Sequence, residues 1–262
     1  MKFSVHQASL IGDRKYNQDR VAFAYSQHAV LLVLADGMGG HSHGELAAAI
    51  VIETFIDLFT RHGNQSFADP QTFIGESMAA AHHAIMQLPH DKDVGFPGTT
   101  CIAALIQEGV LYSAYAGDSR LYVLRDQAVL YRTRDHSMVQ QWVDWGVISE
   151  EEGRIHPRRN QITNCLGGIE EMFYAESCPA LTLNSGDRVL LCSDGLWGPF
   201  SDIEIAAALS TASDTELNNL MLTAYAQEGG RADNITAVVL AWDEMQDDKT
   251  TDEVVSVALD IS

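Results

Sequence analysis

The sequence predicts a layered α+β domain built on antiparallel sheets. Two observations indicate this fold class: β-rich apolar runs follow one another in hairpin succession, and helical segments come before and after them. Strands and helices that are segregated in this way pack as layers around a common core. The chain has 262 residues, of which 46% are hydrophobic, so it can form one large domain or two small ones with a substantial core.

The first third of the chain is expected to hold two strands and then two helices. Val21 to Tyr25 is β-rich, and Val30 to Ala35 is apolar without interruption, which is typical of a strand buried on both faces. Apolar residues at helical spacing predict a helix from about Glu45 to Thr60. A second helix is predicted to start at Asp69-Pro70, an N-cap followed by proline at the first helical position, and to run to about Leu88.

The rest of the chain returns to strands and short helices. The expected meander consists of Thr99 to Ile106, Val110 to Ala116, Leu121 to Leu124 and Ala128 to Tyr131. Residues 137–168 should hold two short helices, the second opened by a capping box of Ser149 with Glu152. The later expected elements are a strand from Arg188 to Cys192, a helix from about Asp202, a helix opened by a capping box of Ser213 with Glu216, and a strand from Ile235 to Trp242.

The chain divides into one domain, residues 1–242, and an acidic C-terminal tail, residues 243–262. No repeat, low-complexity tract or linker interrupts the first part, whereas the sequence turns acidic and polar from Asp243. The end of the tail, Val254 to Ile261, is apolar enough to pack as a short strand or to bind a partner, and packing is the favoured interpretation.

The net charge excludes several classes of partner. The 36 Asp and Glu residues against 16 Lys and Arg give a formal charge of -20, which argues against binding to nucleic acid or to an anionic membrane. The N-terminus lacks a signal-peptide pattern, and the longest apolar run, Ala29 to Ala35, is too short to span a bilayer. The four cysteines form no CxxC pair, and Cys101 and Cys192 lie in or beside apolar runs as buried free thiols do. We therefore expect a cytoplasmic protein.

Aspartates recur at the ends of the apolar strands. Each one alone is an ordinary turn or cap residue, because Asp and Gly are common in turns. Together they indicate a site for divalent cations, since carboxylates are the ligands that Mg²⁺ and Mn²⁺ prefer and zinc would draw on His and Cys. A glycine after an aspartate also lets the backbone approach closely, so that its carbonyl can become a ligand. The five positions are Asp19, Asp36 followed by Gly37, Asp118, Asp194 followed by Gly195, and Asp233.

The five aspartates lie in the motifs Arg14-Lys15-Tyr16-Asn17-Gln18-Asp19, Asp36-Gly37-Met38-Gly39-Gly40-His41, Gly117-Asp118-Ser119-Arg120, Ser193-Asp194-Gly195-Leu196 and Asp233-Asn234. These motifs resemble those of the metal-dependent PPM (type 2C) Ser/Thr protein phosphatases in their compact bacterial form. The resemblance covers roughly residues 3 to 242, in order and with family-like spacing. It implies a central β-sandwich of two antiparallel sheets flanked by helix pairs, in α/β/β/α layers.

The resemblance also implies a role for each position. Asp36 would bridge two Mn²⁺ or Mg²⁺ ions, and Gly37 would add its carbonyl to one of them. Asp194 and Asp233 would complete the first ion and Asp19 would serve the second. Asp118, with Asp194, matches a third-metal position of bacterial members. Arg14 would grip the substrate phosphate, for which a planar guanidinium is suited.

The implied reaction is hydrolysis of phosphoserine and phosphothreonine by a metal-bridging hydroxide, without a covalent enzyme intermediate. The leaving alkoxide calls for a proton donor, and His41 is the candidate. Two positions depart from the pattern of many eukaryotic members. Met38 stands where they have a catalytic histidine, and Gln18 replaces a glutamate near the second metal. The implied partners are phosphorylated proteins, among them a bacterial Ser/Thr kinase and its substrates, and we expect the phosphatase to be a monomer.

Basic residues are concentrated between Arg120 and Arg159, which hold seven of the sixteen Lys and Arg residues. Residues 137–168 correspond to the variable flap of the family, which borders the active site; they are called the flap segment below. Arg154, Arg158 and Arg159 in this segment are predicted to hold or steer phosphoprotein substrates through the long-range field.

The sequence argues against two alternative functions. A cysteine-based phosphatase needs a His-Cys pair with an arginine six residues after the cysteine, and none of the four cysteines has this context. A pseudophosphatase would keep the fold as a regulatory binding module. The loss of a metal aspartate would favour it, but all five are present.

Overall fold

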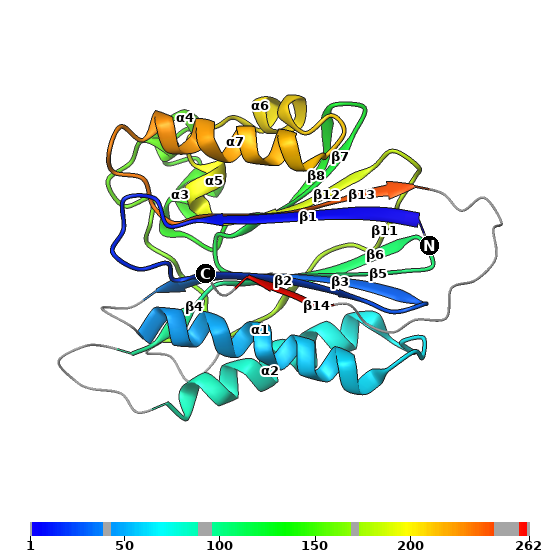
Figure 1. Cartoon of the computed structure of the whole chain (residues 1–262). Coiled ribbons are helices and arrows are strands. Elements are labelled where there is room, and N and C mark those ends of the chain that lie inside the picture. The colour runs from blue at the N-terminus through cyan, green and yellow to red at the C-terminus, as the bar shows by residue number, and fades with distance from the viewer. Residues whose placement is uncertain (1, 39–42, 89–95, 169–172, 244–256, 261–262) are drawn as a thin grey trace.

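The structure, a computed structural model, describes residues 2–38, 43–88, 96–168, 173–243 and 257–260. Two antiparallel sheets lie face to face, and helices cover the outer face of each (Figure 1). The expected α+β fold, a central sandwich of two antiparallel sheets flanked by helix pairs, is confirmed.

The first sheet has the order β1-β13-β12-β7-β8, with antiparallel neighbours throughout. Its strands are β1 (Lys2–Leu10), β7 (Arg120–Arg125), β8 (Ala128–Arg132), β12 (Arg188–Cys192) and β13 (Ile235–Asp243). β1 was not expected from the sequence. It is an edge strand whose residues are half-buried or exposed, so it lacks the apolar run that marks the central strands.

The second sheet has the order β10-β6-β5-β3-β2-β14. β11 also pairs with β6, and β4 joins the end of β3 to β9. The strands are β2 (Asp19–Tyr25), β3 (Ala29–Met38), β4 (Gly98–Thr99), β5 (Cys101–Gln107), β6 (Val110–Ala116), β9 (Leu166–Gly167), β10 (Glu176–Ser177), β11 (Leu181–Thr182) and β14 (Val257–Asp260).

The helices form two outer layers. α1 and α2 cover the second sheet, and α5, α6 and α7 cover the first (Figure 1). Their bounds, with those of the two flap helices, are α1 (His43–His62), α2 (Pro70–Met86), α3 (Met138–Asp144), α4 (Glu150–Arg154), α5 (Asp194–Trp197), α6 (Asp202–Ala208) and α7 (Asp214–Gln227).

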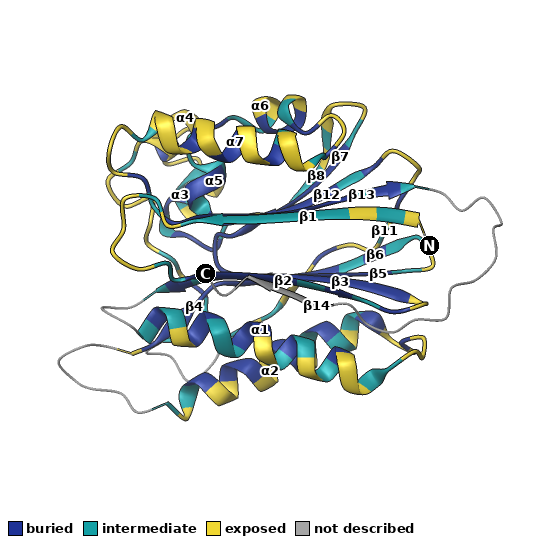
Figure 2. Cartoon of the chain, viewed as in Figure 1, coloured by how far each residue is buried: buried dark blue, intermediate teal, exposed yellow. Residues whose placement is uncertain are grey.

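Alternate residues of β3 explain why its sequence is apolar on both faces. Leu31 and Val33 pack toward α1 and α2, whereas Leu32 and Leu34 pack between the two sheets. Successive side chains of a strand point to opposite faces, so a strand covered by a helix layer and by a second sheet must be apolar at every position. Figure 2 shows the same burial across the central strands, while the helices present exposed residues outward.

The caps agree with the sequence in all but one place. Asp69 accepts a hydrogen bond from Thr72 N (3.1 Å) at the start of α2, and the capping box of Ser149 with Glu152 opens α4. The expected capping box at α7 is wrong in its second half. Ser213 does accept from Glu216 N, but the Glu216 carboxylate turns back to Ser210 and Thr211, two other donors that precede the helix.

The end of the predicted tail includes a strand. Residues 244–256 lie outside the described residues, and β14 pairs antiparallel with β2, Val257 opposite Ala24 and Asp260 opposite Val21. The edge of β2 in the second sheet is therefore covered by the C-terminal residues of the chain. Across the described ranges, no helix is long and apolar enough to cross a membrane.

Candidate metal and phosphate site

The strand ends bring the predicted metal ligands to one end of the sandwich. Asp19 begins β2 and lies opposite Asp36 in the pairing of β2 with β3. Asp194 follows β12, and Asp233 precedes β13, the strand that pairs with β12. Asp118 lies in the turn that connects β6 of the second sheet to β7 of the first. Carboxylates from both sheets thus meet where the chain crosses between them.

The carboxylates raise one another's pKa values. Burial raises the pKa of Asp36 well above its usual range, and the charges of Asp19, Asp194, Asp118 and Asp233 raise it further. Burial also raises the pKa of Asp194 to about 7, with added repulsion from Asp233 and Asp19. The charge of Arg159 lowers the pKa of Asp194, yet that pKa stays raised, so the cluster is short of positive charge.

Asp19 and Asp118 are the most deeply buried members. Burial raises the pKa of Asp19 to about 6 even though its Oδ2 accepts a hydrogen bond from Ser193 Oγ (2.8 Å). Burial and the charge of Asp194 raise the pKa of Asp118 well above its usual range. Asp118 Oδ1 is buried and has no hydrogen-bond partner within the described ranges. An orphaned buried carboxylate oxygen is costly unless a cation or a donor satisfies it.

Close backbone packing requires the two glycines that follow the aspartates. A Cβ on Gly37 would lie 2.3 Å from Gly44 O, at the start of α1. A Cβ on Gly195 would lie 2.1 Å from Asn234 O, so glycine at this position lets the loop of Asp194 approach the loop of Asp233. Only glycine fits at either position.

The donor set fits hard divalent cations. It consists of carboxylate oxygens that repel one another, one of them without a partner, while Asp36 and Asp194 remain partly accessible to solvent. Among the described residues, however, no three His, Cys, Asp or Glu side chains already stand together as a preformed cluster. Two of the carboxylates have protein partners: Asp233 pairs with Arg14, and Asp19 accepts from Ser193 Oγ.

Arg14 lies beside the carboxylates. Its Nη2 donates to Asp233 Oδ2 at 2.5 Å, and slightly more than half of its side chain is exposed. Asn234 holds the loop that carries Arg14. Its Nδ2 donates to Ile11 O (2.8 Å) and Tyr16 O (3.1 Å), and its Oδ1 accepts from Gln18 N (2.8 Å).

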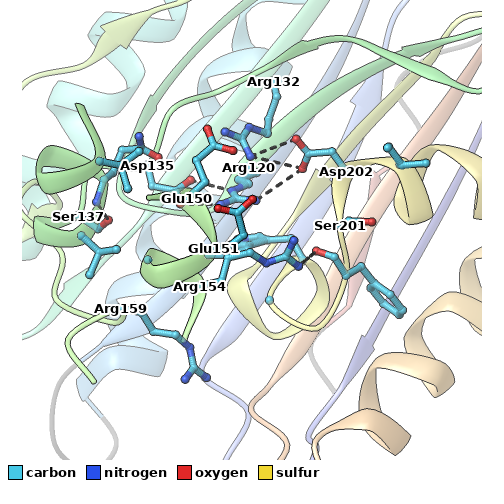
Figure 3. Close-up of a pocket in the computed structure, with 18 residues that line it drawn as sticks. Arg120, Arg132, Asp135, Ser137, Glu150, Glu151, Arg154, Arg159, Ser201 and Asp202 are labelled. Carbon is cyan, nitrogen blue, oxygen red and sulfur yellow. Dashed lines mark hydrogen bonds and ion pairs between the residues drawn. The ribbon is translucent and has the colours of Figure 1, made fainter. Parts of the chain in front are cut away.

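The three flap arginines occupy different environments. A cavity of about 500 Å³ lies between α3 and α4 on one side and the α5–α6 region on the other (Figure 3). Arg154 spans it and donates to Phe200 O, which ties the flap to that region. Arg159 lies at the cavity edge, and its charge lowers the pKa of Asp194, so it is near the carboxylates. Arg158 is exposed on the turn after α4. His41 falls outside the described residues.

Several residues that the sequence analysis did not single out support the site. Thr100 Oγ1 accepts from Asp36 N (2.9 Å) and shares a hydrogen bond with Ser119 Oγ (2.7 Å). Ser193 bonds Asp19, and its Oγ also accepts from Thr236 N (3.0 Å). The adjacent aspartates were a signal for Ser193, Ser119 and Asn234, because each stands next to one of them. Thr100 had no such signal, since it reaches Asp36 only through the pairing of neighbouring strands.

Comparison with known proteins identifies relatives for nearly the whole chain. The family model described as protein phosphatase 2C matches residues 6–225. The serine/threonine protein phosphatase PstP of Mycobacterium tuberculosis is 38% identical over 215 residues, which cover 80% of this chain but 40% of that protein. The chain thus spans less than half the length of that relative. A putative protein phosphatase 2C-type of Streptococcus pyogenes is 30% identical, over 89% of this chain and 94% of its own.

Solved structures agree with the sequence matches. The serine/threonine phosphatase of S. agalactiae superposes with a TM-score of 0.81 at 29% identity, covering 93% of this chain and all of its own (100%). The catalytic domain of PstP in complex with two manganese ions has a TM-score of 0.76 at 33% identity, covering 92% of this chain and 99% of that domain.

Proposed function

Because this chain belongs to the protein phosphatase 2C family, we propose that it is a metal-dependent phosphatase that hydrolyses phosphoserine and phosphothreonine in proteins. The observation that carries the proposal is that five carboxylates from both sheets lie at one end of the sandwich, and that the pKa values of four of them, Asp19, Asp36, Asp118 and Asp194, are raised. A relative of the same fold that holds two manganese ions supports Mn²⁺ as the cofactor, with Mg²⁺ as the other hard cation suited to such ligands.

The ligands would divide as follows. Asp36 would bridge two ions and Gly37 would offer its carbonyl, with Asp194 and Asp233 at the first ion and Asp19 at the second. Asp118 with Asp194 would hold a third. When bound, such ions lower the pKa of a water molecule and neutralise charge on the phosphoryl oxygens. The raised pKa values of Asp19, Asp36, Asp118 and Asp194 support cation binding by these residues, because neighbouring cations would relieve the repulsion among them.

Arg14 would bind the phosphate. Its guanidinium has five N–H donors and the ion pair with Asp233 uses one, so the others can reach a phosphoryl group at the same edge of the cluster. His41, in the connection between β3 and α1, would give a proton to the leaving serine or threonine oxygen.

The substrate protein would approach over the flap. Arg158 and Arg159 are exposed, Arg159 lies near enough to Asp194 to lower its pKa, and both would attract a phosphorylated chain toward an otherwise acidic protein. Arg154, which we also expected there, already donates to Phe200 O and would serve substrates through the position of the flap. A bacterial Ser/Thr kinase and its substrates are the proposed partners of a monomeric enzyme. The four cysteines form no disulfide in the described part of the chain and three of them are buried, which suits the cytoplasm, where thiols stay reduced.

Turnover with and without metal tests the function. The protein, stripped with EDTA, should hydrolyse p-nitrophenyl phosphate and a phosphothreonine peptide only after Mn²⁺ is restored. Asp36→Asn should lower kcat by more than about 100-fold, because changes in the surroundings of metal ligands alone cost roughly 10- to 100-fold. Its circular dichroism should match that of the wild type. A wild-type protein that binds Mn²⁺ and phosphopeptide without hydrolysis would favour the regulatory alternative. Substantial turnover by Asp36→Asn at saturating Mn²⁺ would contradict the bridging role.

A further inference from the structure

His136 is a buried histidine between the carboxylate cluster and the flap segment. It lies in the loop that joins β8 to α3, and only 6% of its surface is exposed. Its Nδ1 is 3.1 Å from Gly117 N and 3.0 Å from Asn164 Nδ2, and its Nε2 is 2.9 Å from Glu176 Oε2. Both ring nitrogens therefore have protein partners.

These partners define the tautomer. A backbone N–H can only donate, so Nδ1 must accept from Gly117 and carries no proton. Asn164 Oδ1 accepts from Tyr174 N (3.2 Å), which leaves its Nδ2 to donate to Nδ1 as well. Nε2 then carries the proton and donates to the Glu176 carboxylate. The ring is held in one orientation by three residues.

His136 binds both backbone groups of Gly117. Besides the bond to Nδ1, the Gly117 carbonyl accepts from His136 N (3.0 Å). Gly117 has a φ of +114° and a Cβ there would lie 2.6 Å from Thr100, so its conformation is open only to glycine. The next residue is Asp118, whose Oδ1 is the orphaned oxygen of the cluster. The orientation of Gly117 thus determines where that carboxylate points.

The same histidine is attached to the flap segment. His136 O accepts from Thr163 N (2.8 Å), near the end of the segment, and Ser137, its neighbour, forms a β-bridge with Ile162. Its ring stacks on Tyr115 of β6, with centroids 4.6 Å apart and planes at 15°, and contacts Tyr174 at 4.9 Å. His136 therefore contacts both the flap segment and Gly117, the residue before Asp118.

We propose that His136 is a positioning residue of the metal site. As the neutral tautomer with its proton on Nε2, it fixes Gly117, directs the Asp118 carboxylate into the cluster and couples that direction to the flap. The proposal rests on the proposed function only in taking Asp118 as a ligand of the third ion. No contact of His136 with substrate is involved.

Two substitutions separate this role from packing. In His136→Asn the side-chain oxygen stands near the position of Nδ1 and can accept from Gly117, whereas in His136→Gln the amide nitrogen stands near Nε2 and can donate to Glu176. Each variant lacks part of the imidazole ring and the hydrogen bonds of one ring nitrogen, so both substitutions should lower Tm. Only His136→Gln should weaken the third Mn²⁺ site, by roughly 10- to 100-fold as for residues that orient metal ligands. His136→Asn should bind Mn²⁺ at this site about as tightly as the wild type does.

Mn²⁺ binding is measured on EDTA-stripped protein by the electron paramagnetic resonance signal of free Mn²⁺, with p-nitrophenyl phosphate turnover alongside. Glu176→Gln is the matched control, because its amide oxygen still accepts from Nε2–H, and it should bind Mn²⁺ as the wild type does. Unchanged Mn²⁺ binding by His136→Gln, or equal losses in both His136 variants, would overturn the proposal.

A second measurement covers a His136→Gln protein that does not fold. Glu176→Ala leaves the ring in place but removes the acceptor of the Nε2 proton, one of the contacts that hold the ring against Gly117, so the amide of Gly117 should exchange its hydrogen faster than in the wild type. Unchanged exchange would overturn the proposal. This readout needs no turnover, so a wild-type protein without phosphatase activity would refute the proposed function and leave the role of His136 to be decided by exchange.

Discussion

Arg14 contacts Asp233, so the residue proposed to bind phosphate is the ion-pair partner of a proposed metal ligand. Asn234 and Asp13 fix this contact. Asn234 bonds the backbone on both sides of Arg14, and Asp13 Oδ2 accepts from Ala232 N (2.8 Å), just before Asp233. Two loops that lie over 200 positions apart in the chain are thereby held in register.

Arg14→Ala is expected to raise KM for p-nitrophenyl phosphate by roughly 10- to 100-fold, since a hydrogen bond to a charged group contributes about 1.5–3 kcal/mol. The phosphate is present in the ground state and in the transition state, so kcat should change little. Steady-state kinetics at saturating Mn²⁺ measure both constants. Arg14→Lys keeps the charge without the planar fork and should fall in between. A loss confined to kcat would place Arg14 in transition-state chemistry instead.

At the scale of elements, the strand ends create a cluster that resists ionisation. The pKa of Asp19 is raised to about 6 and that of Asp194 to about 7, both mainly by burial, compared with about 3.9 for aspartate in an unfolded chain. At pH values between the pKa of an unfolded aspartate and the raised pKa values of Asp19 and Asp194, the folded, metal-free protein binds more protons than the unfolded chain does. Its free energy of unfolding must therefore decrease as pH rises through about 4 to 7.

This pH dependence can be measured by urea unfolding in EDTA at pH 5 and pH 8. The wild type should lose stability between the two. Asp36→Asn should lose less, because it removes the carboxylate that all the others repel. Saturating Mn²⁺ should restore the stability of the wild type at pH 8, since only the folded state offers the assembled ligands. The electrostatic interpretation would be contradicted if the difference in unfolding free energy between the metal-free wild type and metal-free Asp36→Asn were the same at pH 5 and pH 8.

The flap is the second element with a testable role. Replacing Arg158 and Arg159 together with Gln should lower kcat/KM for a phosphoprotein, and more so at low salt, where screening is weak. Turnover of p-nitrophenyl phosphate should change little, because so small a substrate does not extend over the flap. Arg61→Gln, on α1 and paired with Asp57 of the same helix, is the control for loss of a positive charge away from the flap. Equal losses on both substrates would indicate a disturbed metal site rather than steering.

Arg154→Gln is expected to behave differently. Its guanidinium ties α4 to Phe200 O, so its loss should loosen the flap and affect both substrates at every salt concentration.

At the scale of the whole molecule, three apolar layers hold the four structural layers together. One lies between α1 and α2 and the second sheet, one between the sheets, and one between the first sheet and α5 to α7. The end of the sandwich that carries the candidate site includes Gly117 and Asp118, where the chain passes from one sheet to the other. A site assembled from both sheets depends on the sandwich as a unit.

Deletion of residues 244–262 tests the contribution of β14. The truncated protein loses the strand that pairs with β2, whose first residue is Asp19, and Tm should fall by several degrees, because about 1 kcal/mol corresponds to roughly 2–4 °C in a domain of this size. Turnover at low temperature should persist, since no proposed ligand is removed. Thermal melts of the full and shortened chains make the comparison, and equal Tm values would contradict the pairing of β14 with β2 in solution.

The sequence by itself determined the fold class, the central strands and the aspartates of the candidate site. An unbroken apolar run such as Val30 to Ala35 predicts a strand that is covered on both faces. The Asp-Gly pairs indicate where such strands end. Such signals are local, because they depend on the period of one segment and on the chemistry of adjacent residues.

Tertiary structure decided what depends on distant partners. The edge strand β1 has no strong pattern of its own and exists because β13 pairs with it along its whole length. The Glu216 carboxylate accepts from Ser210 and Thr211 instead of closing its capping box, and the Arg154 guanidinium donates to Phe200 O. His136 meets Gly117 only across the fold. Which hydrogen-bond partner a polar side chain takes is a competition among all the groups within reach, and folding alone brings those groups together.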